Sequence, residues 1–282
     1  MTSTLIADSG STKTAWRLVQ PNQPVISIQT DGLNPYFQDE GQLRSTLQAQ
    51  LLPQLPVLTT PVTVYFYGTG CTGPDSNNRI TRAIQTTLQP AATIHVASDM
   101  LGAARSAAHT QPGIVCILGT GSNTCFFDGQ QITTPSYSLG FWLGDEGSGG
   151  NLGKRLVTAF LHGHLPDELH KDFASQYGLD RLTVLDHAYN KPYPNRYFAR
   201  FAPFLSAHRH TNFVRDLVRS AFTDFLQLYV HRMPDYAQYP IHFVGSIGYH
   251  FADWLTDLLT EQHLQAGRFV QAPIDGLLAY HR

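Results

Sequence analysis

One pattern occurs twice in this sequence and restricts the fold more than any other feature. Over residues 3–19 an apolar run leads into a turn rich in Gly, Ser and Thr, and a second β-prone run follows. The same order returns over residues 113–127. Each copy predicts a β-hairpin with a longer loop. The repetition predicts an internal duplication, with two mixed α/β domains that each begin with such a hairpin.

The rest of the chain alternates between strand-like and helix-like patterns, as expected for the α/β class. We expect a first domain over residues 1–110 and a second over 111–282. The second domain contains a helical insertion at about 146–232, and its closing helix, 274–282, is able to pack back on the first domain. The expected strands are 3–8, 13–19, 24–30, 62–67, 93–97, 113–118, 123–127, 131–134, 241–244 and 268–271, and the expected helices outside the insertion are 38–53, 76–89, 99–109, 249–263 and 274–282.

Charge and cysteine content exclude several classes of partner and site. The 282 residues carry a net charge of −2, so no basic face for nucleic acid or an anionic membrane is expected. The sequence has no leader pattern and no long apolar span, which predicts a cytoplasmic protein. Cys71, Cys116 and Cys125 form an odd set without CxxC spacing, so reduced thiols are expected. Cys116 and Cys125 are expected in the core, and Cys71 in an exposed loop.

The first hairpin turn has the residue types that bind phosphate. Gly10 lets the backbone come close to a ligand, while Ser9, Ser11 and Thr12 supply hydroxyl groups and backbone N–H donors. Asp8, at the strand end, is an acceptor that suits Mg²⁺, often through water. The alternative is a polar hairpin turn without a ligand.

Two further turns have similar chemistry. The turn Gly119-Thr120-Gly121-Ser122 ends the first strand of the second copy. If the two hairpin turns face each other, they form a cleft that holds a polyphosphate from both sides. A third turn, Gly245-Ser246-Ile247-Gly248, follows the strand 241–244 and is typical of a loop that covers an adenosine or phosphate group. Its alternative is a strand-to-helix turn in which Gly245 only permits a positive φ.

Three segments together resemble the BadF/BadG/BcrA/BcrD ATPase family, and within it the N-acetylglucosamine kinase branch of the sugar kinase/Hsp70/actin superfamily. The segments are residues 8–14, 119–123 and 144–150, and the resemblance spans the whole chain. It implies two ribonuclease-H-like (actin-like ATPase) domains that close on ATP, Mg²⁺ and a hydroxylated acceptor. The nucleotide-binding residues that it implies are Asp8 (also the metal ligand), Gly10, Ser11, Thr12, Lys13, Gly119, Thr120, Gly121, Ser122, Gly245 and Ser246.

Phosphoryl transfer to a sugar hydroxyl group requires a carboxylate that accepts the hydroxyl proton. Asp99 lies where the strand 93–97 passes into the helix 99–109. From its position alone, Asp99 is a helix N-cap. The resemblance instead implies that Asp99 is the general base and contacts the sugar.

The resemblance also implies that Asn34, Trp142 and Asp145 line the acceptor pocket. An Asn before Pro is also typical of a turn. Acidic residues such as Asp145 and Glu146 before a helix can act only on its dipole. The role of Glu146 stays open.

Three functions are consistent with these features. The first is an ATP-dependent kinase for an amino sugar, foremost the 6-hydroxyl of N-acetylglucosamine, with glucosamine and N-acetylmuramic acid as alternatives. The second is an ATPase activator of a dehydratase or reductase, which needs cysteines that ligate an iron–sulfur cluster, and the chain lacks a suitable set. The third is a sugar-responsive regulator, for which no helix-turn-helix precedes the first strand. Similar proteins are commonly dimers, so a homodimer is possible.

Overall fold

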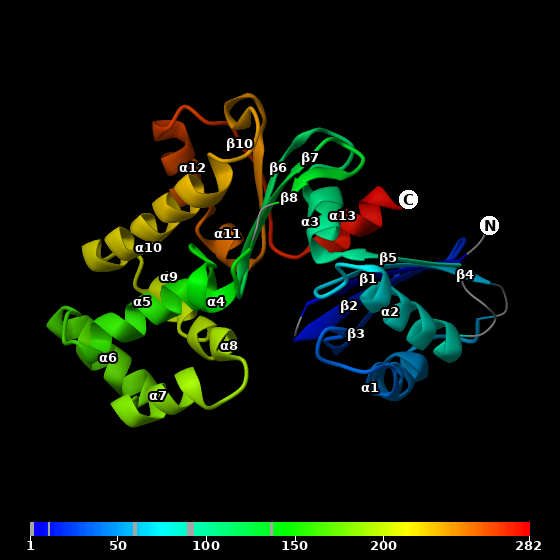
Figure 1. Cartoon of the computed structure of the whole chain (residues 1–282), viewed down its shortest axis with the longest axis horizontal. Helices are drawn as coiled ribbons and strands as arrows, with labels where there is room; N and C mark the ends of the chain where they lie inside the picture. The colour runs from blue at the N-terminus through cyan, green and yellow to red at the C-terminus, as the bar shows by residue number, and fades with distance from the viewer. Residues whose placement is uncertain (1–2, 11, 59–60, 89–92, 136–137) are drawn as a thin grey trace. The chain divides into compact units, whose positions relative to one another are not determined.

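The chain folds into two compact units (Figure 1). The computed structural model describes residues 3–10, 12–58, 61–88, 93–135 and 138–282. Unit 1 comprises Met1–His109 and Ala272–Arg282, and unit 2 comprises Thr110–Gln271. The second domain was expected to run to residue 282. The compact unit ends at Gln271, since the last helix packs on the sheet of unit 1, as the sequence had allowed for the closing helix.

Unit 1 is built on a five-stranded sheet with the order β3-β2-β1-β4-β5. The first three strands form an antiparallel meander, and β4 and β5 run parallel to β1. The strands are β1 (Ser3–Ser9), β2 (Lys13–Val19), β3 (Ile26–Asp31), β4 (Val62–Gly68) and β5 (Thr93–Ser98).

Unit 2 repeats this arrangement. Its sheet has the order β10-β9-β6-β7-β8, in which β6, β7 and β8 form the meander and β9 and β10 add in parallel beside β6. The strands are β6 (Gly113–Leu118), β7 (Ser122–Phe127), β8 (Ile132–Pro135), β9 (Ile241–Val244) and β10 (Ala266–Val270). The predicted duplication of an actin-like α/β domain is therefore confirmed.

Helices cover both faces of the sheet in unit 1 (Figure 1). Alternate residues of a strand point to opposite faces, so Leu5 packs toward α1 and α2 while Ile6 packs toward α3 and α13. Arg17 of β2 also forms an ion pair with Asp275 of α13, 2.9 Å long. The helical segments of this unit are α1 (Glu40–Thr46), η1 (Leu47–Leu51), η2 (Leu52–Gln54), α2 (Pro74–Thr87), α3 (Asp99–Ala107) and α13 (Pro273–Tyr280).

Between β8 and β9, unit 2 carries the predicted helical insertion. Side chains of α5 and α10 form one apolar core with Ile114, Cys116 and Leu118 of β6. Within the described residues, no helix is both long and apolar enough to span a membrane. The helical segments are α4 (Gly140–Leu143), α5 (Gly149–Leu161), α6 (Asp167–Tyr177), α7 (Arg181–Tyr189), α8 (Pro194–Ala199), α9 (Ala202–Ala207), α10 (Asn212–Phe225), η3 (Leu226–Val230) and η4 (Tyr236–Gln238), followed after β9 by α11 (Ser246–His250) and α12 (Ala252–Glu261).

Candidate functional site

Three adjacent strand ends bring Asp8, Thr69 and Asp99 to one edge of the sheet in unit 1. Ser9 of β1 pairs with Gly68 of β4, and Gly68 pairs with Ser98 of β5. Asp8 precedes Ser9, while Thr69 and Asp99 come directly after the other two residues. The carboxyl ends of parallel strands are where ligands bind in open α/β sheets. Sequence analysis identified the two carboxylates but not Thr69.

Asp99 is the first residue of α3 and is partly exposed. The N-cap is Ser98, whose hydroxyl accepts a hydrogen bond from the N–H of Leu101. Oδ2 of Asp99 accepts a 2.6 Å hydrogen bond from the Thr69 hydroxyl, and Oδ1 accepts one of 2.8 Å from the N–H of Met100. The alternative of Asp99 as the N-cap is therefore wrong, because Ser98 has that role.

The two carboxyl groups lie in an environment that disfavours charge. Burial raises the pKa of Asp99, and the hydrogen bonds from Thr69 and Met100 oppose this rise. Burial and the charge of Asp99 raise the pKa of Asp8 to about 7, against the opposing effect of Lys13. An incompletely compensated carboxylate of this kind fits a divalent cation.

A magnesium ion at this edge would take few ligands from the protein. In the described parts of the chain, no group of three or more His, Cys, Asp or Glu side chains is arranged to hold a metal. Mg²⁺ normally keeps several waters and binds one or two carboxylates plus substrate phosphates. Asp8 fits that mode of binding.

The first hairpin turn is only partly described, since Ser11 lies outside the described residues. Thr12 and Lys13 are exposed, and the N–H of Gly10 donates to the carbonyl of Lys13. Ser9 is fully buried, and its hydroxyl donates to the carbonyl of Leu33 and bonds to the Thr14 hydroxyl. The expectation that Ser9 offers a hydroxyl to phosphate is therefore wrong: its side chain holds the loop after β3.

That loop carries Asn34, which is buried. Its Oδ1 accepts a hydrogen bond from the N–H of Tyr36, as in the turn-forming alternative. Its Nδ2 donates no hydrogen bond within the described chain. Arg79 of α2 donates hydrogen bonds to the carbonyls of Pro35 and Gln38 and thereby holds this loop against α2.

Cys71 does not lie on the surface as expected. It is 2% exposed, and burial raises the pKa of its thiol to about 12. The loop after β4 folds inward, which places the sulfur against the apolar core of unit 1. Cys116 and Cys125 are buried as predicted.

In unit 2, the second hairpin turn rests on the start of α5. The N–H groups of Gly149 and Gly150 donate to the carbonyls of Gly119 and Thr120, at 2.8 and 3.0 Å. Across the described residues, the N–H groups of Thr120 and Gly121 have no acceptor. The turn therefore presents free backbone donors, which suits an anionic ligand.

The structure places Asp145 against this turn. Its Oδ1 accepts a 3.2 Å hydrogen bond from the N–H of Ser122, and a Cβ on Gly121 would lie 2.9 Å from its Oδ2. Asp145 is buried and has a φ of +60°, a conformation that L residues rarely adopt. Burial raises the pKa of its carboxyl group, and the bond from Ser122 opposes this rise.

The neighbours of Asp145 have separate contacts. Glu146 accepts a 2.6 Å hydrogen bond from the Tyr229 hydroxyl, which gives it a structural partner. Trp142 is half exposed and stacks on Tyr189, with ring centroids 5.9 Å apart and planes inclined by 4°. Two exposed aromatic side chains therefore lie side by side on the surface of unit 2.

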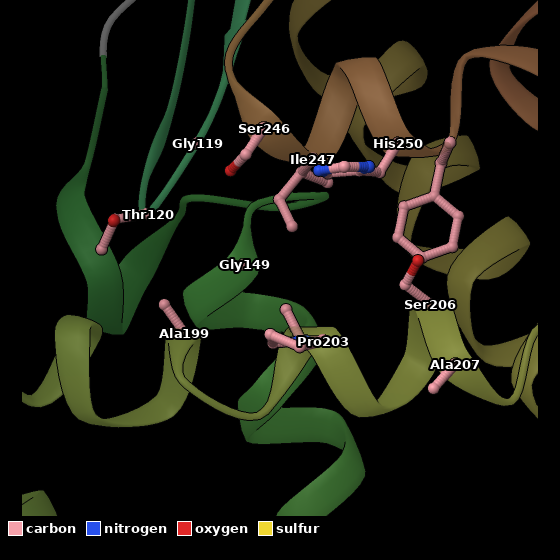
Figure 2. A pocket seen from close by; sticks show the side chains of 12 residues that line it. Gly119, Thr120, Gly149, Ala199, Pro203, Ser206, Ala207, Ser246, Ile247 and His250 are labelled. Atoms are coloured by element: carbon pink, nitrogen blue, oxygen red, sulfur yellow. The ribbon is translucent and has the colours of Figure 1, made fainter. Parts of the chain in front are cut away.

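A cavity of about 540 Å³ begins at the second hairpin turn and lies wholly in unit 2 (Figure 2). Gly119 and Thr120 form one end, and helices α8 and α9 lie opposite α11. The size falls in the range of small-ligand pockets. Gly119, Thr120 and Ser246, which line this cavity, are predicted nucleotide-binding residues. The polar side chains of Ser206 and His250 were not predicted, because the motif residues gave no signal for the helical wall.

Gly245 has a different role from Ser246. Its φ is +117°, and a Cβ there would lie 2.5 Å from the carbonyl oxygen of Leu118. The backbone itself therefore requires glycine at this position, which agrees with the strand-to-helix alternative.

Comparison with known proteins shows what this chain is similar to. A candidate N-acetylglucosamine kinase from Porphyromonas gingivalis is 40% identical, with a TM-score of 0.93 over 100% of this chain and 98% of its own. A candidate N-acetylglucosamine kinase from Chromobacterium violaceum is 23% identical, with a TM-score of 0.75 over 100% and 99%. A ROK family glucokinase from Streptomyces griseus, in complex with glucose and AMPPNP, shares the fold at 12% identity and a TM-score of 0.52 over 99% and 96%. No protein-family model and no curated protein matches the chain.

Proposed function

Because the chain belongs to the N-acetylglucosamine kinase branch of the BadF/BadG/BcrA/BcrD ATPase family, we propose that it transfers the γ-phosphoryl group of ATP to the 6-hydroxyl group of N-acetylglucosamine. The relative that is 40% identical over the whole chain supports an amino sugar as the acceptor. The finer choice of the 6-hydroxyl is our proposal.

One observation carries the nucleotide half of this proposal: a cavity of about 540 Å³ opens from a glycine-rich turn that has free N–H donors. The adenosine group would occupy the cavity between α9 and α11, beside Ser206 and His250. The phosphates would then lie on the turn, where Thr120 and Gly121 donate to their oxygens. Ser246, at the start of α11, is a further phosphate or ribose contact.

The acid–base half of the proposal rests on Asp99. The carboxylate of Asp99 keeps free acceptor positions beside the two hydrogen bonds that it already receives. The sugar hydroxyl would donate its proton to Asp99 as its oxygen attacks the γ-phosphorus in line. Asp8 would hold Mg²⁺ through water; the bound ion would spread the charge of the transferred group.

We propose that Asn34 contacts the sugar through its unpaired Nδ2. Asp145 offers carboxylate oxygens to sugar hydroxyls, although its contact with Ser122 also suits a role beside the phosphates. Trp142, which is half exposed, offers an aromatic surface to the apolar face of a pyranose ring. Thr12 and Lys13, both exposed, remain proposed phosphate contacts of the first turn.

Asp99→Asn tests the proposal. The variant should keep its affinity for AMPPNP and lose turnover by about 10²–10⁴-fold, because a neutral amide cannot accept the hydroxyl proton. Asp75→Asn is the matched control, since Asp75 is an exposed acid in the first turn of α2. Wild-type turnover of Asp99→Asn would show that Asp99 is not the base.

The acceptor is identified by measuring ADP release with N-acetylglucosamine, glucosamine, N-acetylmuramic acid, glucose and N-acetylmannosamine, and with no acceptor. We expect N-acetylglucosamine to give the highest kcat/KM. A phosphorus signal split into a triplet by two protons would identify the ester of a primary hydroxyl group. ADP release that does not depend on sugar would support the ATPase activator instead, although all three cysteines are buried. Nucleotide binding without turnover would support a regulator.

A further inference from the structure

Thr69 lies between the two carboxylates of unit 1, immediately after β4. Its N–H donates a 2.9 Å hydrogen bond to the carbonyl of Ser9, next to Asp8 on β1. Its hydroxyl donates the 2.6 Å hydrogen bond to Oδ2 of Asp99. The backbone bond fixes Thr69 on the sheet, and its single hydroxyl proton is directed to Asp99.

Asp99 thus receives donors from two different elements. The N–H of Met100 belongs to the same helix as Asp99, whereas the hydroxyl of Thr69 belongs to the neighbouring strand end. A carboxylate turns easily about its last side-chain bond, for which the torsional preference is broad. One donor leaves that rotation possible, whereas two donors on opposite oxygens fix the plane of the carboxylate.

The short hydrogen bond from the Thr69 hydroxyl to Asp99 is expected to be strong. Hydrogen bonds to an ionised carboxylate are shorter and roughly twice as strong as bonds between neutral groups. Asp8 and Cys71 interact electrostatically with Asp99, but neither donates a hydrogen bond to it in the described chain.

We propose that Thr69 is a positioning residue that orients the carboxylate of Asp99 toward the acceptor hydroxyl. This inference rests on the proposed function, in which Asp99 is the base. In this role Thr69 would contact neither the nucleotide nor the transferred group. It acts only through Asp99.

Thr69→Val and Thr69→Ser test this role. Valine keeps the branched shape and lacks the donor, so kcat should fall about ten- to a hundredfold while the KM for ATP and the affinity for AMPPNP stay unchanged. Serine keeps the hydroxyl and should restore most of kcat. Thr72→Val is the matched control, because Thr72 is an exposed threonine of the same loop. Thermal melting of each variant reports on folding.

The outcomes separate the two proposals. A wild-type kcat for Thr69→Val, with Asp99→Asn inactive, would overturn the role of Thr69 and leave the proposed function intact. Equal losses in Thr69→Val and Thr69→Ser would also overturn it, since packing and not the hydroxyl would then matter. Wild-type turnover of Asp99→Asn would instead remove the premise.

Discussion

At the scale of single residues, Gly119 is a position where a substitution should affect ligand binding without affecting folding. A Cβ on Gly119 would meet no atom of the structure within 4 Å, although the residue lines the cavity. Gly119→Val should therefore melt like the wild type and bind AMPPNP about tenfold more weakly or worse, because the side chain would fill the space that the phosphates need. Titration calorimetry measures this affinity.

The matched control for Gly119→Val is Gly73→Val. Gly73 also has open space around its Cβ position, but it lies before α2 in unit 1 and is not among the residues that line the cavity of unit 2. Gly73→Val should leave the affinity for AMPPNP unchanged. Unaltered binding by Gly119→Val would contradict the placement of the phosphates on the second turn. At Gly121 the same test is ambiguous, since a Cβ would press on Asp145.

Single residues were predictable where local sequence determines their place. An apolar run that ends in Asp99 before a helix pattern identifies a strand-to-helix junction without any structure. The hydrogen bond from Thr69 was not predictable, because it depends on which strands become neighbours and in which register. The prediction that Cys71 is exposed was wrong for the same reason, because the sequence of a loop between two glycines does not indicate that the loop folds inward.

At the scale of elements, α2 supports the loop that carries Asn34. Arg79 is the residue that connects the two, through the carbonyls of Pro35 and Gln38. Arg79→Ala should raise the KM for the sugar several-fold to about tenfold and leave the affinity for AMPPNP unchanged, because the loop loses charge-assisted hydrogen bonds. Steady-state kinetics with varied sugar measures the effect.

Arg82→Ala is the control for this prediction. Arg82 lies on the same helix, and its ion pair with Glu40 is exposed at the surface, where such pairs contribute little. Its KM for the sugar should equal that of the wild type. If Arg79→Ala also matched the wild type, the loop would not depend on α2 for its conformation.

Strands were easier to predict than helices. All ten expected strands are present, with bounds within two residues of those predicted. The largest differences are at β3, which begins two residues later than expected, and at β10, which begins two residues earlier. The expected helix 38–53 is instead divided into α1, η1 and η2. Segments with π-type bonding, such as η1, depend on local strain that periodicity does not encode.

At the scale of the whole molecule, unit 1 is completed by the end of the chain. His281, after α13, stacks on Tyr65 at 3.8 Å and bonds to the Tyr67 hydroxyl at 2.8 Å. Burial, followed by the charges of Arg105 and His95, lowers the pKa of His281 from 6.5 to about 4. Between these values the unfolded chain binds a proton that the folded chain does not, so stability falls as pH falls from 6.5 to about 4.

His281→Gln removes this titration. Its melting temperature should therefore depend less on pH between 6.5 and about 4 than that of the wild type, whatever its absolute stability. The exposed His210→Gln serves as control and should retain the wild-type dependence. Parallel curves for the wild type and His281→Gln would contradict a shifted titration at His281. Thermal melts at a series of pH values give the comparison.

The duplication was predictable from the repeated hairpins, whereas the boundary of the second domain was not. Residues 273–280 show an apolar side through Ile274 and Leu277. That pattern predicts a packed helix but does not say which sheet it covers. Tertiary packing decides which sheet the helix covers, and Ile6 and Tyr67 of unit 1 form the complementary apolar face.

The late position of α13 has a consequence for synthesis on the ribosome. Translation produces all of unit 2 before residues 272–282 leave the exit tunnel, so the earliest part of the chain finishes folding last. During that interval α3 alone covers this face of the sheet, and the apolar surface of Ile6 and Tyr67 that α13 will bury stays exposed to chaperones. A premature stop codon just before α13 would thus damage the first-made unit and spare the second.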